Sequence, residues 1–474
     1  MKVNSFIHDG LGLKKVEVEV VLVKGLPQTK ILGLPDALIK ESGIRIKSAI
    51  KAQGYRWPSD QQILVQINPT HIRKSSRGLD LAIAAAYIWE TEQVSRPEGA
   101  VSLYGEISLE GEVKCPRDLD NPFSNLGQYP VWTGTSEQVL SFDTIQMNRL
   151  SDLANPTSVA GCAETNNLKR PKLTEQSLTA SDANIAAIVA AGEHHTIWVG
   201  PPGTGKTTLA RATSEILGDP SPELSRQIER VNTLFARPQS WRPVIEPHHT
   251  ATPISVIGGG QPPKPGELTR AHGGVLILDE LLEFHKRIQD VLRQPMESGT
   301  VLVSRASGYA EFPANFLCLA TTNLCPCGMF VPKPSHRCRC RSHQLRNYLD
   351  RLSGPVVDRF AIVAIKEKTN ESRSNPLVNV LENVKKAREF AMESRGQNLP
   401  NSKMDIFSLD HIKSYLPSFL DSMSHRRRMA LSQVARTIAD LNRSEQIKRE
   451  HLSMAMEHTV LNSLKIAVDS YKFV

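Results

Sequence analysis

The sequence predicts an α/β protein whose central part is a parallel β-sheet covered by helices. Between residues 179 and 368, helical patterns separate three short apolar runs, HTIWVG, GVLILDE and NFLCLATTN. This alternation is typical of parallel strands joined by helical crossovers. A glycine-rich octapeptide, GPPGTGKT, lies directly between the first run and a helical pattern, and beyond residue 369 helical patterns dominate.

Length and composition limit the class of protein. A chain of 474 residues is too long for one compact core and predicts two or three domains. We find no run of about 18 or more uncharged apolar residues and no secretory signal, so we expect a cytoplasmic protein without a membrane span. The net charge of +8 permits binding to nucleic acid without establishing it, and the aromatic content of 5% disfavours a large base-stacking platform.

Composition shifts along the chain predict the domain boundaries. Residues 1–150 mix strand and helix patterns and predict an α+β domain, whereas residues 151–178 are polar, contain prolines and predict a linker. Residues 179–368 form the predicted α/β core, and residues 369–474 form a predicted helical domain.

Individual elements of the first domain are also predicted. The β-branched run VEVEVVLVKGLP indicates a strand that ends at Gly25 and Pro27. The segment PDALIKESGIRIKSAIKAQG indicates a helix with Gly54 at its C-terminal stop, and a strand at 62–68 and a helix at 79–89 follow.

The octapeptide fits the phosphate-binding loop pattern in full, with the strand before it and the helix after it that the motif requires. Glycines let consecutive N–H groups turn towards phosphates, and the helix N-terminus adds a positive end. We expect Lys206 to reach the β- and γ-phosphates of ATP and Thr207 to bind Mg²⁺. The predicted nucleotide-binding residues are Gly200, Pro201, Pro202, Gly203, Thr204, Gly205, Lys206, Thr207, Thr208 and Asp279.

The apolar strand GVLIL ends in two carboxylates, Asp279 and Glu280. After a phosphate loop at this distance, Asp279 is expected to hold Mg²⁺, usually through water. Glu280 is expected to polarise the attacking water. Two acids at the end of a strand also cap a following helix, and this alternative is open for the pair taken by itself.

Longer segments carry a resemblance to a known family. GPPGTGKTTLA, the segment RPVIEPHHTATPISVIGGGQPPKPGELTRAHGGVLILDELLEF, DRF, GLPQTKILGLPDALIKESGIRIKSAI and VARTIADL resemble the magnesium-chelatase-like AAA+ proteins of the ComM/YifB family. The resemblance implies an AAA+ core, a Lon-protease-like (ribosomal S5 domain 2-like) N-terminal domain and a C-terminal helical lid. It also implies an ATP-dependent hexameric DNA helicase that drives branch migration in natural transformation and homologous recombination.

The resemblance assigns three further roles. Asn323 is the implied sensor of the γ-phosphate, Arg359 the finger that reaches a neighbouring subunit's nucleotide, and Arg426 the second sensor on the lid. Arginine suits both of its positions because it stays charged and its fork contacts phosphate oxygens. Arg427 and Arg428 adjoin Arg426, so the second-sensor assignment is open to a shift.

Four of the seven cysteines, Cys325, Cys327, Cys338 and Cys340, form a C-x-C…C-x-C pattern. Four thiolates suit a tetrahedral Zn²⁺ site, with His336 as a substitute ligand, and the alternative is a set of reduced structural thiols. An odd number of cysteines disfavours a secreted disulfide framework.

A Lon-type protease needs a serine nucleophile and a lysine that accepts its proton. Ser75 and Ser76 lie near the relevant segment, but Arg77-Gly-Leu stands where the family pattern has Ser-Ala-Gly, and Lys114 is misplaced for the base. We therefore predict a non-proteolytic domain.

Four basic side chains are candidate DNA contacts: Arg73, Lys74 and Arg77 in the first domain, and Arg305 on a predicted hairpin. For the three in the first domain, a solvated basic face is an equal alternative. In place of the family's RPFRAPHH, this chain has RPVIEPHH, which includes Glu246. DNA engagement is therefore open, and two alternatives to a DNA motor are a chelatase-type ATPase that remodels a protein partner and a nucleotide-dependent assembly scaffold.

Overall fold

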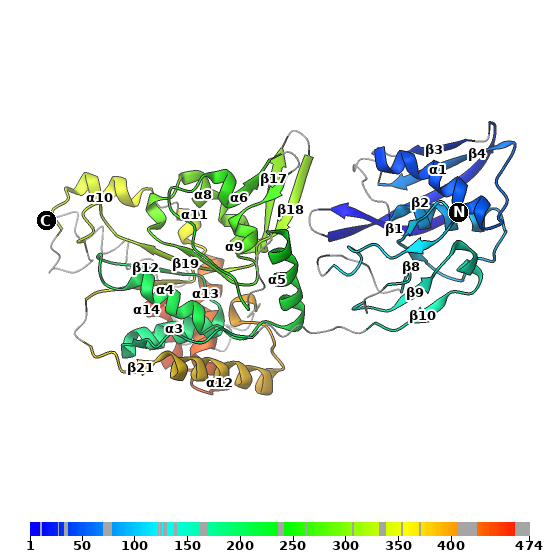
Figure 1. Ribbon diagram of the computed structural model, residues 1–474. Coiled ribbons are helices and arrows are strands. Elements are labelled where there is room, and N and C mark those ends of the chain that lie inside the picture. The colour runs from blue at the N-terminus through cyan, green and yellow to red at the C-terminus, as the bar shows by residue number, and fades with distance from the viewer. Residues whose placement is uncertain are drawn as a thin grey trace. The chain divides into compact units, whose positions relative to one another are not determined.

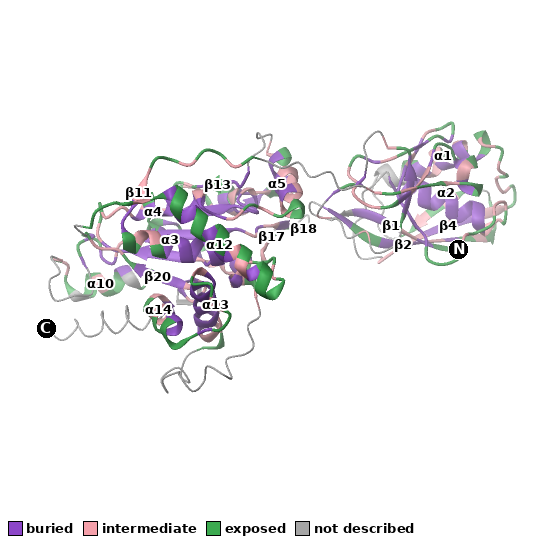
Figure 2. Ribbon diagram, turned by 90° about the horizontal axis from the view of Figure 1, so that it is seen from below, coloured by how far each residue is buried: buried purple, intermediate pink, exposed green. Residues whose placement is uncertain are grey.

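The computed structural model describes residues 1–9, 12–26, 28–32, 37–69, 78–121, 123, 126, 130–136, 140–161, 169–235, 241–260, 263–305, 308–330, 338–351, 354–368, 371–404 and 424–459. The chain divides into two compact units, Met1–Asn166 and Asn167–Val474 (Figure 1). Each unit has its own buried apolar core, which Figure 2 shows as the purple interior of each unit.

The first unit is built on a mixed sheet with the strand order β10-β9-β8-β5-β1-β2-β4-β3. Its elements are β1 (Lys2–Asp9), β2 (Gly12–Lys24), β3 (Thr29–Leu32), α1 (Ala37–Ala52), β4 (Gln61–Asn68), α2 (Leu79–Glu90), β5 (Ser102–Leu103), β6 (Glu106–Ile107), β7 (Val113–Lys114), β8 (Val131–Gly134), β9 (Thr144–Met147), η1 (Leu150–Ala154) and β10 (Thr157–Val159). The strands and helices predicted at 62–68 and 79–89 are confirmed as β4 and α2.

Helix α2 is the centre of this unit's core. Its residues from Leu79 to Trp89 are all buried, because the helix is apolar on every side. Asp80 is a charged residue in this buried set, and its carboxylate accepts a hydrogen bond of 2.7 Å from Arg45 of α1. A buried carboxylate needs such a partner, so this ion pair fixes α1 against α2.

The linker predicted at 151–178 contains ordered pieces of both units. Residues Thr157–Val159 form β10, which pairs antiparallel with β9 in the first sheet, and Ser177–Leu178 form β11, which pairs with β21 (Asn375–Pro376) in the second unit. Strands of three and two residues are too short to show the periodicity on which sequence prediction depends.

The second unit contains a sheet of five parallel strands in the order β13-β16-β19-β12-β20. These strands are β12 (Thr196–Val199), β13 (Val244–Ile245), β16 (Val275–Leu278), β19 (Leu317–Thr322) and β20 (Ile362–Ile365). The prediction of a parallel sheet from the three apolar runs is confirmed. Because parallel strands end at one edge, the residues that follow β12, β16 and β19 gather there.

Helices cover the sheet on both faces (Figure 1). The helices in this part of the second unit are α3 (Ala180–Gly192), α4 (Lys206–Glu215), α5 (Pro222–Leu234), α6 (Pro253–Ile257), α7 (Glu267–Arg270), η2 (Leu281–Glu283), α8 (Lys286–Val291), α9 (Arg293–Ser298), α10 (Ser342–Leu349) and α11 (Gly354–Val357). Two small hairpins accompany them: β14 (Gly258–Gly259) with β15 (Lys264–Pro265), and β17 (Thr300–Arg305) with β18 (Gly308–Pro313). Among the helices described, none has the length and apolarity needed to cross a membrane.

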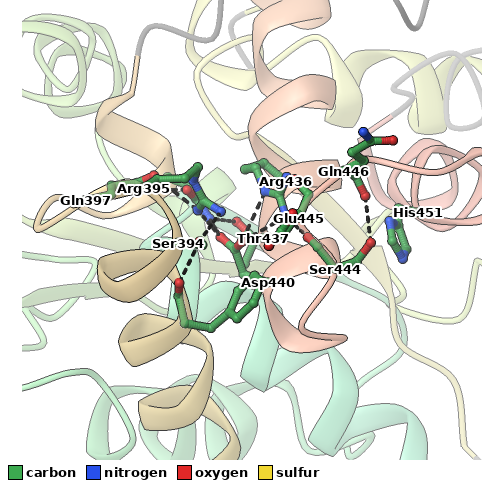
Figure 3. A network of polar contacts seen from close by, with 12 residues as sticks. Ser394, Arg395, Gln397, Arg436, Thr437, Asp440, Ser444, Glu445, Gln446 and His451 are labelled. Atoms are coloured by element: carbon green, nitrogen blue, oxygen red, sulfur yellow. Dashed lines mark hydrogen bonds and ion pairs between the residues drawn. The ribbon is translucent and has the colours of Figure 1, made fainter.

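The helical C-terminal part comprises α12 (Leu377–Arg395), η3 (Asn401–Lys403), α13 (His425–Leu441) and α14 (Arg449–Thr459). Asp440 of α13 joins α12 and η3 to α13. It accepts a hydrogen bond from Arg395 of α12 at 2.9 Å (Figure 3) and another from Asn401 of η3 at 2.8 Å. Asp440 also bonds Arg436 within α13 at 3.1 Å. A buried carboxylate with three donors locks the packing of α12 against α13.

Two residues at the end of α3 tie the α/β core to these helices. Glu193, at φ +51°, accepts hydrogen bonds of 3.0 Å from both Arg242 and Arg388. Burial alone would raise the pKa of Glu193, but the two guanidinium groups lower it. His194 bonds Thr437 of α13 at 2.8 Å, and burial lowers its pKa to about 3, so the imidazole is neutral at physiological pH.

Candidate active site

The loop Gly200–Thr207 connects β12 to α4, as the motif predicts. Its glycines adopt positive φ angles: 152° at Gly200, 71° at Gly203 and 83° at Gly205. A Cβ added at Gly203 or Gly205 would meet no atom within 4 Å, so backbone conformation rather than space requires glycine there. This turn and the N-terminus of α4 are suited to cradling an anion.

Gly200 has a different reason to be glycine. A Cβ at this position would lie 2.0 Å from the carbonyl oxygen of Lys366, just after β20. On the other side, the Gly200 N–H donates to the Thr322 carbonyl at 3.2 Å. The start of the loop is therefore fixed between the ends of two neighbouring strands.

Lys206 is buried beneath the loop. Its Nζ donates to the carbonyl oxygens of Gly200 at 2.8 Å and Pro201 at 2.9 Å, and to Oδ1 of Asn323 at 3.2 Å. Burial lowers the pKa of Lys206, while the carboxylates of Asp279 and Glu280 act in the opposite direction. The contact with Asn323 brings together two residues that are 117 positions apart in sequence.

Asp279, at the end of β16, accepts hydrogen bonds from two hydroxyl groups. Its Oδ1 accepts hydrogen bonds from Thr207 at 2.7 Å and from Thr321 at 2.5 Å. Hydroxyl and carboxylate oxygens are the donors that Mg²⁺ prefers, so the side chains of Thr207 and Asp279 fit this ion. The structure thus brings together the pair that the sequence predicts for Mg²⁺.

Glu280 follows Asp279 in a left-handed conformation, with φ 57° and ψ 54°. Its N–H donates to Thr321 Oγ1 at 3.1 Å, and its side chain is exposed. The fixed backbone and exposed carboxylate are suited to a base that contacts water. Non-glycine residues seldom adopt this conformation, and such outliers concentrate at functional sites.

Arg359 and Arg426 meet at one carboxylate. Glu297 of α9 accepts from Arg359 Nη2 at 2.7 Å and from Arg426 Nη2 at 2.6 Å. Arg359 also donates from Nε to the Arg293 carbonyl at 3.1 Å. The structure therefore places the implied finger and the implied second sensor side by side.

Arg427, next to Arg426 in sequence, bonds mainly to backbone carbonyl groups inside the protein. It is buried, and it donates to the carbonyls of Val357 at 2.8 Å, Phe360 at 3.1 Å and Thr459 at 3.2 Å. Its Nε bonds Asp358 at 3.0 Å. Arg426 is 41% exposed and pairs with Glu297 and Asp358, so the second-sensor assignment stays with Arg426 as a prediction.

The four clustered cysteines are brought together beside the phosphate loop. The Sγ atoms of Cys325, Cys327, Cys338 and Cys340 all lie within 4.8 Å of one another. Burial opposes ionisation of Cys327, but backbone N–H groups of Met329 and Arg339 lower its pKa to about 6. This set of ligands is compatible with Zn²⁺.

Several predicted residues do not enter this site. Ser75, Ser76, Arg73, Lys74, Arg77 and His336, and the side chain of Arg305, lie outside the described residues. Thr208 is exposed in the first turn of α4, and Lys114 is exposed on β7. Glu246, which departs from the family pattern, pairs with Arg211 of α4 at 2.9 Å.

Two residues of this arrangement were not predicted. Thr321 contacts both Asp279 and the Glu280 backbone, and its position two residues before Asn323 on a strand could have indicated it, because alternate strand residues share a face. Glu297 holds the two arginines, and no local sequence pattern singles it out.

Comparison with known proteins gives the family. Residues 174–373 match the family described as magnesium chelatase, subunit ChlI, residues 18–120 match subunit ChlI of Mg-chelatase, and residues 376–458 match the ChlI C-terminal family. YifB of Escherichia coli K12 is 32% identical, over 98% of this chain and 98% of that protein. Competence protein ComM of Haemophilus influenzae is 30% identical, over 95% of this chain and 96% of that protein. Lon protease 2 of Bacillus subtilis is 25% identical over 247 residues, which is 47% of this chain and 44% of that protein. The chain therefore belongs to the magnesium-chelatase-like AAA+ proteins of the YifB/ComM family.

Proposed function

We propose that this protein is an ATP-hydrolysing motor that acts on DNA as a ring, with six subunits as the family resemblance implies. The observation that carries the proposal is the joint placement of Lys206, the Thr207–Asp279 pair and Glu280 at one edge of the sheet. Transfer of a phosphoryl group to water requires a cation that binds the phosphates, ligands for Mg²⁺ and a carboxylate that activates the water. Lys206, the Thr207–Asp279 pair and Glu280 are the respective candidates.

Each residue has a distinct task in this proposal. The loop N–H groups and Lys206 bind the β- and γ-phosphates, which breaks the bonds from Nζ to the loop carbonyls. Thr207 and Asp279 would hold Mg²⁺, which would neutralise charge on the phosphates. Glu280 accepts the proton of the attacking water, and Asn323 orients that water from its position next to Lys206.

Arg359 and Arg426 complete the site of a neighbouring subunit. Because Glu297 holds both guanidinium groups, we assign both to the same nucleotide, where their charge stabilises the transition state. An isolated chain then lacks part of its catalytic site, and hydrolysis depends on ring assembly.

DNA is the proposed substrate, and branch migration in natural transformation and homologous recombination is the proposed process. One relative is named a competence protein, and the net charge of +8 favours a phosphate backbone. Residues 1–150 are proposed to form a Lon-protease-like domain without proteolytic activity, since Arg77-Gly-Leu stands where the family pattern has Ser-Ala-Gly and Lys114 is misplaced for the base.

The test is ATP turnover by the assembled chain without DNA and with single-stranded, duplex or four-way DNA. We expect DNA to increase turnover, four-way or single-stranded DNA most. The stimulation should weaken steeply between about 50 and 200 mM salt, because DNA binding releases counterions. Lys206→Ala, which lacks the phosphate-binding cation, is the control for contaminating ATPases.

Two results would contradict a DNA motor. If no DNA stimulates turnover but a protein partner does, the chain is a chelatase-type ATPase that remodels proteins. If ATP binds but is never hydrolysed, the chain is a nucleotide-dependent scaffold.

A further inference from the structure

We propose that Cys325, Cys327, Cys338 and Cys340 bind one zinc ion, and that this zinc site holds the loop after β19 against the phosphate loop and so sets the affinity for nucleotide. The inference rests on the proposed nucleotide site, and its metal-binding part stands independently of it. The cluster would act as a positioning device, since no thiol is assigned a contact with ATP.

The spacing of the sulfur atoms fits a tetrahedral ion. The Sγ–Sγ distances are 3.4 Å for Cys325–Cys327, 3.7 Å for Cys327–Cys338 and 3.6 Å for Cys325–Cys338. A tetrahedron with Zn–S bonds of about 2.3 Å has edges of about 3.8 Å. A disulfide would require a separation of about 2.05 Å, so the thiols are arranged as ligands and not as bonded pairs.

Backbone N–H groups donate hydrogen bonds to two of the sulfur atoms. The Phe330 N–H donates to Cys325 Sγ at 3.2 Å, and the Cys340 N–H donates to Cys338 Sγ at 3.4 Å. Hydrogen bonds of this kind stabilise thiolates and orient them towards a cation. Four sulfur atoms within 4.8 Å of one another, with backbone N–H groups directed at two of them, form a complete set of ligands for one cation.

The cluster is connected to the nucleotide site by direct packing. Gly328, at φ +77°, lies so close to the phosphate loop that an added Cβ would be 2.8 Å from Cδ of Pro202. Its N–H donates to the Cys325 carbonyl at 2.9 Å, which closes the turn that carries the first two cysteines. The turn that carries Cys325 and Cys327 therefore packs directly against the phosphate loop at Pro202.

A second connection runs through the backbone. Cys325 is two residues after Asn323, whose Oδ1 contacts Lys206 Nζ at 3.2 Å. Cys325 is fully buried, so an ion bound to it would fix the chain just beyond Asn323. Loss of the ion would loosen Asn323 and the Gly328 turn, each of which contacts a phosphate-binding residue.

The metal is tested first, on the full chain purified without added zinc. We expect about one zinc ion per chain by elemental analysis. After exchange, Co²⁺ should give the intense thiolate-to-metal charge-transfer absorption of a tetrahedral cysteine site. Substoichiometric zinc together with no cobalt absorption would overturn the metal site.

The coupling is tested with Cys338→Ser, because Cys338 lies outside the turn 325–328 that packs on the phosphate loop. We expect this variant to lose zinc and to bind ADP, measured by calorimetry, about tenfold more weakly. Cys115→Ser, which removes a cysteine from the other compact unit, is the matched control and should change neither quantity. Unchanged ADP affinity after loss of zinc would overturn the coupling.

Gly328→Ala separates coupling from misfolding of the cysteine segment. The added methyl group presses on Pro202 and strains the turn at φ +77°, but it removes no thiol ligand, so zinc content should be unchanged while ADP affinity falls. If this variant binds ADP as tightly as the wild type, the packing of Gly328 on Pro202 does not set the affinity for nucleotide. If the wild-type chain holds zinc but binds no nucleotide, the proposed function fails and the metal site stands.

Discussion

Replacement of Glu280 by glutamine should slow ATP hydrolysis by about 10²–10⁴-fold and leave ATP binding unchanged. Glutamine keeps the shape of the side chain but cannot accept the proton of the attacking water. Glu280 is exposed in a fixed left-handed backbone conformation, so the substitution removes no buried contact. Steady-state turnover measured beside ATP affinity checks this result.

Glu283→Gln is the matched control, because Glu283 is an exposed carboxylate three residues further on that pairs with Arg351 at 3.6 Å. It should retain turnover. If Glu280→Gln hydrolyses ATP at the wild-type rate, Glu280 is not the base.

Replacement of Arg359 by alanine should lower turnover by about 10³–10⁵-fold, the range found for arginine fingers. Glu297 keeps Arg426 as a partner at 2.6 Å, so the substitution does not leave that carboxylate unpaired. Arg351→Ala, which removes a side chain that is 56% exposed, is the control and should be close to wild type.

Mixing two inactive chains tests whether Arg359 acts between subunits. A ring that contains both Arg359→Ala and Glu280→Gln chains has some interfaces with an intact Glu280 on one side and an intact Arg359 on the other. We therefore expect the mixture to regain part of the turnover that each variant lacks alone. A mixture that stays as inactive as its components places Arg359 in its own subunit's site.

Local patterns in the sequence were sufficient for the phosphate loop and for three of the five strands of the core sheet. GPPGTGKT predicts both the turn and the helix that follows, and the apolar runs predict β12, β16 and β19, because a fully buried parallel strand is apolar on both faces. The convergence of Lys206, Asp279 and Asn323 follows from the parallel order of these strands.

Contacts between segments far apart in the chain could not be predicted from the sequence. The sharing of Glu297 by Arg359 and Arg426 joins α9 to the helical C-terminal part, and the packing of Gly328 on Pro202 joins two loops. Neither contact has a local periodicity, since both depend on how the elements pack. The short strands β10 and β11 were assigned to a linker for a similar reason, because their pairing partners and not their own residues define them.

ATP and ADP binding by the full chain, compared with that of Lys206→Ala, tests the nucleotide pocket most directly. Lys206 Nζ is buried and bonded to loop carbonyls that ATP would replace with phosphate oxygens. We predict tight binding by the wild-type chain and a loss of about 10²-fold or more in the variant, since a charged hydrogen bond to phosphate is removed. Equal affinities, or no binding by the wild-type chain in any state of assembly, would contradict the motor.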